Sequence, residues 1–284
     1  MGETRMREIH VDEIRDMVAQ MCIDAAYTLS DDVLTAFDRA IEIETAPAAR
    51  EIIGLLVENA RIAREEHIPV CQDTGIAVFF VEIGQDLMIK NGFLLDAINE
   101  GVRKGYREGF LRKSVVDPLT RKNTGDNTPA IIYTELVPGD KLKISFMPKG
   151  GGSENMSVVR MLRPTEGVDA IRNFVVSCML NAGANPCPPV VIGVGIGGDF
   201  EKAALLSKKA LLRPVGNPNP KLELASLEET LLKAVNKTGI GPEGLGGKMT
   251  AMAVHVESFP CHMATLPVAV NINCHAARHK TILL

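Results

Sequence analysis

The 284-residue sequence contains no tryptophan, and only 4% of its residues are aromatic. It also lacks an excess of basic residues, because its formal net charge is −4. Both shortages argue against nucleic-acid binding, which needs exposed rings or a positively charged surface. No apolar run suits a signal peptide or a transmembrane helix. We therefore expect a cytoplasmic protein that binds neither nucleic acid nor membranes.

The six cysteines include no Cys-x-x-Cys pair. In a cytoplasmic protein they are expected to stay thiols or to bind metal rather than to form disulfides. Cys22 and Cys178 lie in the apolar stripes of predicted helices, which favours a place in the core. The others end or follow predicted strands beside Gly, Pro or Asn: Cys71, Cys187, Cys274 and, as a weaker candidate, Cys261.

Apolar periodicity and helix-start signals predict helices at about residues 11–29, from Ser30 onward and at about 47–66, so residues 1–66 should form a helical cluster. Residues 67–284 mix helices with short strands, including a predicted hairpin of 130–137 with 141–147. Helices and strands do not alternate regularly enough for a parallel β-α array. We predict an α/β fold of the mixed α+β type, with the helical cluster packed on mixed or antiparallel sheets in a single domain.

Three polar or glycine-rich segments are candidates for a site. CQDTG (residues 71–75) interrupts two predicted strands at 68–70 and 76–84, and loops placed by buried strands often carry chemistry. The segment 112–129 is long for a connection without regular structure, which suggests a functional loop. In KGGGSENMS (149–157), three glycines could turn backbone N–H groups toward an anion.

Cys187 lies between prolines, which restrict its backbone and remove hydrogen-bond donors. The following GVGIGG has the spacing of a dinucleotide-binding loop, but no second strand ending in an acid follows it. Four histidines and two cysteines near the C-terminus could form a zinc site, although their spacing fits no standard motif. Nucleotide and zinc binding therefore remain lower alternatives.

Three thiolates far apart in sequence suit an iron–sulfur cluster better than a small zinc knot. A cluster held by three protein ligands would leave one iron open, as catalytic metals leave a position for substrate. An open iron can act as a Lewis acid on a hydroxy acid, so hydration or dehydration is favoured over electron transfer. A non-catalytic iron–sulfur scaffold is a further alternative.

CQDTG, LRKSVVDPLTRKNTGDNTPA, KGGGSENMS and the stretch from NPCPP to GIGG resemble the α subunit, or N-terminal half, of class I iron–sulfur fumarate hydratases and tartrate dehydratases. The resemblance covers roughly residues 8–280. It implies a [4Fe-4S] cluster held by Cys71, Cys187 and Cys274. The implied reaction interconverts malate and fumarate, a tricarboxylic acid cycle step, with dehydration of tartrate to oxaloacetate as the alternative.

The same resemblance implies roles for further residues. Gln72, Asp73, Arg112 and one glycine of the triplet, taken as Gly151, would contact substrate, and Lys149 could assist Arg112 in neutralising a dianion. Asp73 would also donate a proton to the leaving hydroxyl. His262 would act in the site of a neighbouring protomer, which implies α–α dimerisation. Fused relatives carry a second domain that closes the site, so this chain is expected to need a separate β subunit, as in an α2β2 enzyme.

Overall fold

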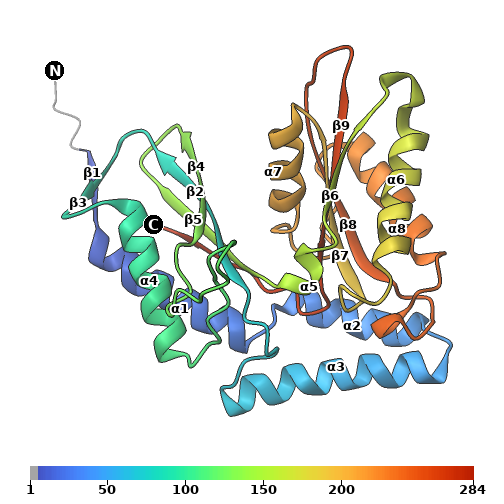
Figure 1. Ribbon diagram of the computed structural model, residues 1–284, viewed down its shortest axis with the longest axis horizontal. Helices are drawn as coiled ribbons and strands as arrows, with labels where there is room; N and C mark the ends of the chain where they lie inside the picture. Colours follow the sequence, from blue (N-terminus) through green and yellow to red (C-terminus); the bar gives the residue numbers. More distant parts are fainter. Residues whose placement is uncertain (1–5) are drawn as a thin grey trace. The chain divides into compact units, whose positions relative to one another are not determined.

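The computed structural model describes residues 6–284. The chain divides into two compact units (Figure 1). Unit 1 comprises Met1–Thr28, Ile62–Lys149 and Arg278–Leu284, and unit 2 comprises Leu29–Arg61 and Gly150–Ala277. Each unit has its own sheet, and each is described by itself below. The expectation of a single domain stays a prediction.

Unit 1 is a four-stranded mixed sheet with two helices packed together beside it. The sheet order is β10 (Lys280–Leu283), β5 (Leu142–Lys149), β2 (Ile76–Gly84) and β4 (Ile131–Val137). The helices are α1 (Val11–Tyr27) and α4 (Leu94–Glu108). A separate two-stranded parallel sheet pairs β1 (Arg7–His10) with β3 (Leu87–Lys90).

Strand β2 organises the sheet of unit 1. Its residues Ala77–Val81 are all buried, so the strand needs neighbours on both edges and cover on its faces. It pairs with β4 in parallel and with β5 antiparallel. The predicted hairpin of β4 with β5 is therefore wrong, because β2 lies between them. The predicted strand at 68–70 is also wrong, since those residues form no strand.

The core of unit 1 lies between this sheet and the two helices. Phe79 of β2 stacks on Phe146 of β5, with ring centroids 4.9 Å apart. Ile98 of α4 and Cys22 of α1 belong to the same buried cluster. The α1–α4 contact is close because Gly105 leaves no room for a Cβ, which would lie 2.6 Å from the Ala19 carbonyl oxygen. The interpretation of Cys22 as a core residue is confirmed.

Unit 2 is built on a second four-stranded mixed sheet covered by helices on both faces (Figure 1). Its strand order is β6 (Val158–Leu162), β9 (Leu266–Asn273), β7 (Val190–Gly197) and β8 (Ala251–Phe259). The helices are α2 (Asp31–Ile43), α3 (Pro47–Glu66, of which 47–61 belong to this unit), α5 (Gly151–Glu154), α6 (Gly167–Ala182), α7 (Phe200–Ala210) and α8 (Leu222–Asn236). Two 3-10 turns cover Pro164–Glu166 and Pro242–Gly244.

The glycines that follow Cys187 serve helix packing. A Cβ on Gly193 or Gly195 would lie 2.0 Å from a carbonyl oxygen of α7, that of Ser207 or Ala203 respectively. Helix α7 therefore rests directly on the backbone of β7. This close approach accounts for the spacing that imitates a nucleotide loop.

The predicted mixed α/β class is confirmed. The three N-terminal helices do form, but α1 belongs to unit 1, whereas α2 and most of α3 belong to unit 2. No helix within residues 6–284 combines the length and the apolarity that crossing a membrane requires.

Candidate functional site

The CQDTG segment forms a tight turn in front of β2 in unit 1. The Gly75 N–H donates to Asp73 Oδ1 at 3.0 Å, and the Asp73 N–H points at Cys71 Sγ at 3.4 Å. Gly75 has a positive φ of 71°, and a Cβ there would lie 2.7 Å from the Lys149 nitrogen. The turn therefore requires glycine at this position. It fixes the orientation of the Asp73 carboxyl and leaves Gln72 exposed.

Three polar side chains from distant parts of unit 1 hold this turn in place. The buried Tyr106 hydroxyl lies 2.8 Å from the Thr74 carbonyl oxygen, and burial raises the pKa of this phenol. Asn127 Nδ2 donates to the Gly75 carbonyl at 3.2 Å, and the Arg278 guanidinium donates to the Asp73 carbonyl at 2.8 Å. Sequence reasoning missed all three anchors. None lies near CQDTG in sequence, and no local pattern marks them.

Both candidate cations of unit 1 lie next to the CQDTG turn. The carbonyl of Arg112 accepts a hydrogen bond from the Thr74 hydroxyl at 2.7 Å, while the Arg112 side chain is exposed. Lys149 ends β5, is paired in register with Ile76 and is almost fully buried. A buried ammonium must be compensated, so Lys149 is not a solvated surface charge.

The predicted proline clamp around Cys187 is present at the corner of unit 2 where β7 begins. Pro186, Pro188 and Pro189 are buried, and the Pro188–Pro189 bond is cis. Cys187 itself is exposed and has a φ of 54°, a conformation that non-glycine residues rarely adopt. Its thiol is thus directed by a backbone fixed on both sides.

Cys274 lies at the same corner because β9 runs antiparallel to β7 and ends where β7 begins. The next residue, His275, contacts Cys187 twice. Its N–H donates to the Cys187 carbonyl at 3.1 Å, and its Nδ1 lies 3.1 Å from the same oxygen. The same Nδ1 lies 2.9 Å from Glu243 Oε1, and the Glu243 N–H donates to the Pro188 carbonyl at 2.8 Å. Two predicted ligands are therefore brought together within one unit.

The glycine segment borders this corner. Gly151 begins the short helix α5, and a Cβ on Gly152 would lie 3.2 Å from the Asn185 carbonyl oxygen, just before Cys187. Glu154 at the end of α5 pairs with the nearly buried Lys208 of α7 at 2.5 Å. This ion pair fixes α5 on the helix behind the sheet. From the sequence, His275 was only one of the histidines of the zinc alternative, and neither Lys208 nor Glu243 was identified.

His262 lies at the other end of the unit 2 sheet. It follows β8, whose last residue Phe259 is paired with Gly197, whereas Cys187 precedes the first residue of β7. Eight strand residues separate the two ends, which amounts to roughly 25 Å at about 3.3 Å per residue. The side chain is exposed, and Nδ1 accepts from the Ala264 N–H at 3.1 Å. His262 therefore does not reach the cysteine corner of its own unit.

The two remaining cysteines, Cys178 and Cys261, differ in burial. Cys178 is buried on α6, and burial raises the pKa of its thiol to about 11. Cys261 lies in the exposed turn after β8, with Sγ 3.2 Å from the Thr265 carbonyl oxygen. All six cysteines fall within the described residues, and none of them forms a disulfide.

The described part of the chain, residues 6–284, contains no group of three or more His, Cys, Asp or Glu side chains that could hold a metal. For the proposed ligands, Cys71 belongs to unit 1, whereas Cys187 and Cys274 belong to unit 2. The donors at the unit 2 corner are thiols on fixed backbone, which suits an iron–sulfur cluster. The zinc alternative loses one ligand, because His255 is buried and its Nδ1 lies 3.2 Å from the Ala210 carbonyl oxygen.

Residues 15–283 match the family described as fumarate hydratase (Fumerase). The chain belongs to the fumarate hydratase family. This membership places it among hydro-lyases and confirms the resemblance carried by its motifs.

Several relatives match this hydro-lyase over nearly the whole of their length. A protein of Methanocaldococcus jannaschii, provisionally named L(+)-tartrate dehydratase subunit alpha, is 42% identical over 272 residues, covering 94% of this chain and 95% of the relative. The L(+)-tartrate dehydratase subunit alpha of Escherichia coli O157:H7 is 34% identical over 288 residues, covering 100% of this chain and 94% of the relative. That of Escherichia coli strain K12 is 33% identical with the same coverage.

Proposed function

We propose that this chain is the α subunit of a two-subunit [4Fe-4S] hydro-lyase that dehydrates L(+)-tartrate to oxaloacetate. The observation that carries this proposal is the end-to-end match to relatives named L(+)-tartrate dehydratase subunit alpha, at 42% and 34% identity. Their names also support a separate β subunit. We place the enzyme in the cytoplasm, where cysteines without disulfides are the rule.

The proposed cluster ligands are Cys71, Cys187 and Cys274. The contacts of His275 with Cys187 support the pairing of the last two, because they fix the backbones of both segments against each other. The bound cluster would supply a Lewis-acid iron at which the substrate hydroxyl can depart.

The chain's own residues bind and orient the substrate. A dicarboxylate brings two negative charges to a protein of net charge −4, so local cations are needed. Arg112 and Lys149, both beside the CQDTG turn, take this role, and Gln72 adds a hydrogen bond from the exposed edge of the turn. Gly151 contributes its backbone N–H.

Asp73 donates the proton that the departing hydroxyl requires. Its carboxyl is held by the Gly75 N–H and its carbonyl by Arg278, so a small displacement of the turn changes where this acid points. The base that removes the C3 proton of the substrate lies on the β subunit. This division of labour makes the isolated chain inactive or nearly so.

His262 acts in the site of a second copy of the chain. Its place at the far end of the sheet from Cys187 and Cys274 supports this assignment, because a strand of eight residues separates it from its own cysteine corner. A dimer of α subunits, each with a β subunit, follows as the assembly.

Interconversion of malate and fumarate is the second candidate reaction. It is favoured by the family description, fumarate hydratase, which matches residues 15–283. Both reactions remove water from adjacent carbons of a four-carbon dicarboxylate, and the two substrates differ by one hydroxyl. That hydroxyl is the feature that the enzyme must recognise to discriminate between them.

The test is an anaerobic assay of the chain co-expressed with its β subunit and reconstituted with iron and sulfide. Oxaloacetate formation from L(+)-tartrate is compared with fumarate formation from malate at equal enzyme concentration. We expect kcat/KM to be higher for L(+)-tartrate and turnover to be lost when either subunit is omitted. A preference for malate would establish the second candidate, and turnover of neither substrate would contradict both.

A further inference from the structure

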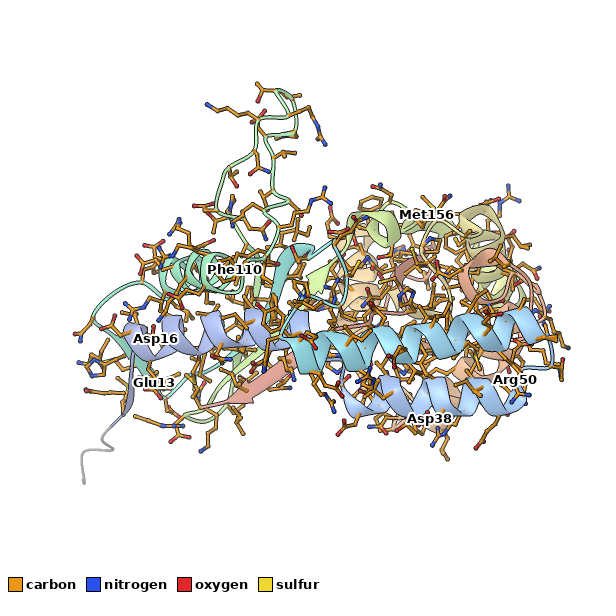
Figure 2. All side chains as sticks on the ribbon, turned by 90° about the horizontal axis from the view of Figure 1, so that it is seen from below. Glu13, Asp16, Asp38, Arg50, Phe110 and Met156 are labelled. Atoms are coloured by element: carbon orange, nitrogen blue, oxygen red, sulfur yellow. The ribbon has the colours of Figure 1, made fainter. Side chains whose placement is uncertain are left out.

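The segment 110–127, which joins α4 to β4, is a preformed hairpin. Val116 and Asn123 form an antiparallel bridge, and the Thr124 N–H donates to the Val115 carbonyl at 3.0 Å. At its tip, Asp117 Oδ1 accepts from the N–H groups of Leu119 and Thr120 at 3.1 and 2.7 Å. Figure 2 shows the green segment after Phe110 extending away from α4. The hairpin therefore has stabilising hydrogen bonds of its own.

This 110–127 hairpin presents two large apolar side chains to solvent. Phe110 is 89% exposed and Leu119 at the tip is 90% exposed, which places both among the most exposed large hydrophobics of residues 6–284. Phe110 also has a φ of 49°, which is costly for an aromatic residue. A strained backbone that holds an aromatic ring in water indicates a surface prepared for contact.

Charge distinguishes the hairpin from the rest of the chain. Its acids already have partners: the Asp117 carboxylate closes the tip, and Asp126 pairs with Arg103 at 2.7 Å. Its four basic residues are Arg112, Lys113, Arg121 and Lys122. The hairpin therefore carries a surplus of positive charge on a protein whose net charge is −4. A negatively charged partner surface would complement it better than a second copy of the same hairpin.

The base of the hairpin is tied to the CQDTG turn. Buried Asn127 accepts from the Ser114 N–H at 2.6 Å and donates to the Gly75 carbonyl at 3.2 Å, and Thr74 bonds the Arg112 carbonyl. A partner bound to the hairpin would therefore order the segment that carries Arg112 and lies beside Asp73.

We infer that the 110–127 hairpin is the docking element for the β subunit, with Phe110 and Leu119 as its apolar anchors and with Lys113, Arg121 and Lys122 facing acidic groups of that subunit. This inference rests on the proposed two-subunit enzyme. Because the hairpin base contacts CQDTG, docking also completes the substrate-binding side of unit 1. The β subunit would thus both contribute residues and fix Arg112.

The experiment measures the affinity of the α chain for a β subunit that is expressed and purified separately, by calorimetry at two salt concentrations. The variants are Phe110→Asn, since asparagine tolerates a positive φ, and Leu119→Asp, which places a charge at the tip. Leu222→Asp is the matched control, because Leu222 is 84% exposed on α8 in unit 2. Each hairpin variant should weaken binding about tenfold or more, as the loss of a buried apolar anchor does.

We expect the thermal midpoint of the isolated chain to be unchanged for Leu119→Asp and Leu222→Asp, and unchanged or higher for Phe110→Asn. Higher salt should weaken binding of the wild type. Affinities within twofold of wild type for both hairpin variants would overturn the inference alone, as would equal weakening by Leu222→Asp. A change in sedimentation of the chain alone would assign the hairpin to a second copy instead. No complex with the wild-type chain would overturn the two-subunit proposal as well.

Discussion

Asn127 joins the loop that carries Arg112 to the turn that carries Asp73, so its replacement tests how the substrate side of unit 1 is held. The side chain is fully buried. Its Oδ1 accepts from the N–H groups of Ser114 and Val115 at 2.6 and 3.3 Å, and its Nδ2 donates to the Gly75 carbonyl at 3.2 Å. Asn127→Ala removes all three hydrogen bonds and takes this acceptor from the N–H groups of Ser114 and Val115.

The expected loss follows from these contacts. Each net hydrogen bond is worth about 1 kcal/mol, and unsatisfied buried groups add to the cost. We therefore expect Asn127→Ala to lower the free energy of unfolding of the isolated chain by about 2–4 kcal/mol. The Arg112 segment also becomes less ordered, so a substrate carboxylate binds more weakly. KM should rise about tenfold or more, the typical cost of weakening a charged hydrogen bond, while kcat falls less.

Urea unfolding of the isolated chain and steady-state kinetics of the reconstituted complex check the two parts. Asn123→Ala is the control, because Asn123 makes hydrogen bonds of similar length in the same hairpin but is exposed. Its effect on unfolding should be below about 1 kcal/mol, since water replaces its partners. Equal destabilisation by both variants, or an unchanged KM for Asn127→Ala, would refute the reasoning.

The other predictions concern unit 2. His255 has a pKa of about 4 in the fold against 6.5 ordinarily, so only the unfolded chain binds its proton between these values. The free energy of unfolding should therefore fall by about 3 kcal/mol as the pH is lowered from 6.5 to about 4. His255→Gln should reduce this pH dependence, as measured by urea unfolding. Lys208→Met should raise the KM for the substrate, because it removes the ion pair with Glu154 that holds α5 in place. In a double-mutant cycle, adding Glu154→Gln to Lys208→Met should change KM little further. Glu243→Gln should weaken cluster retention about tenfold under iron chelation, because His275 loses its charged partner.

Each of these predictions has a contrary result. If His255→Gln leaves the pH dependence of the free energy of unfolding unchanged, other groups cause the sensitivity to acid. Additive effects of the Lys208 and Glu154 variants would show that the ion pair does not position α5. If Glu243→Gln retains iron as well as the wild type does, the Glu243–His275 pair does not stabilise the cluster at the cysteine corner. His275→Ala, which removes the whole imidazole, is the more severe variant for the same comparison.

Local patterns predicted much of the fold. The apolar stripe near residues 11–29 gives α1 at Val11–Tyr27, and the proline start near 47 gives α3 at Pro47–Glu66. The hairpin error arose because β2, the strand that separates β4 from β5, lies about 50 residues earlier in the chain. Strand pairing between distant segments leaves no local signal. The four-residue β10 is likewise too short for a pattern.

The candidate site shows the same division between local and distant information. The CQDTG turn and the proline-clamped Cys187 could be predicted because Asp, Gly and Pro impose local geometry. The anchors could not be predicted, because Tyr106 looks like any aromatic residue on the buried face of a helix. Likewise, Arg278 looks like a surface cation. Only the fold shows that their polar atoms end at the CQDTG carbonyls.

The most direct test of the account is the iron and sulfide content of single cysteine variants after anaerobic reconstitution of the complex. Cys71→Ser, Cys187→Ser and Cys274→Ser should each lose the [4Fe-4S] cluster and the electron paramagnetic resonance signal that its reduced form gives. Cys261→Ser, which replaces an exposed thiol after β8, should keep the full content. A full cluster in any of the first three variants, or its loss in Cys261→Ser, would contradict the ligand set on which the proposed function depends.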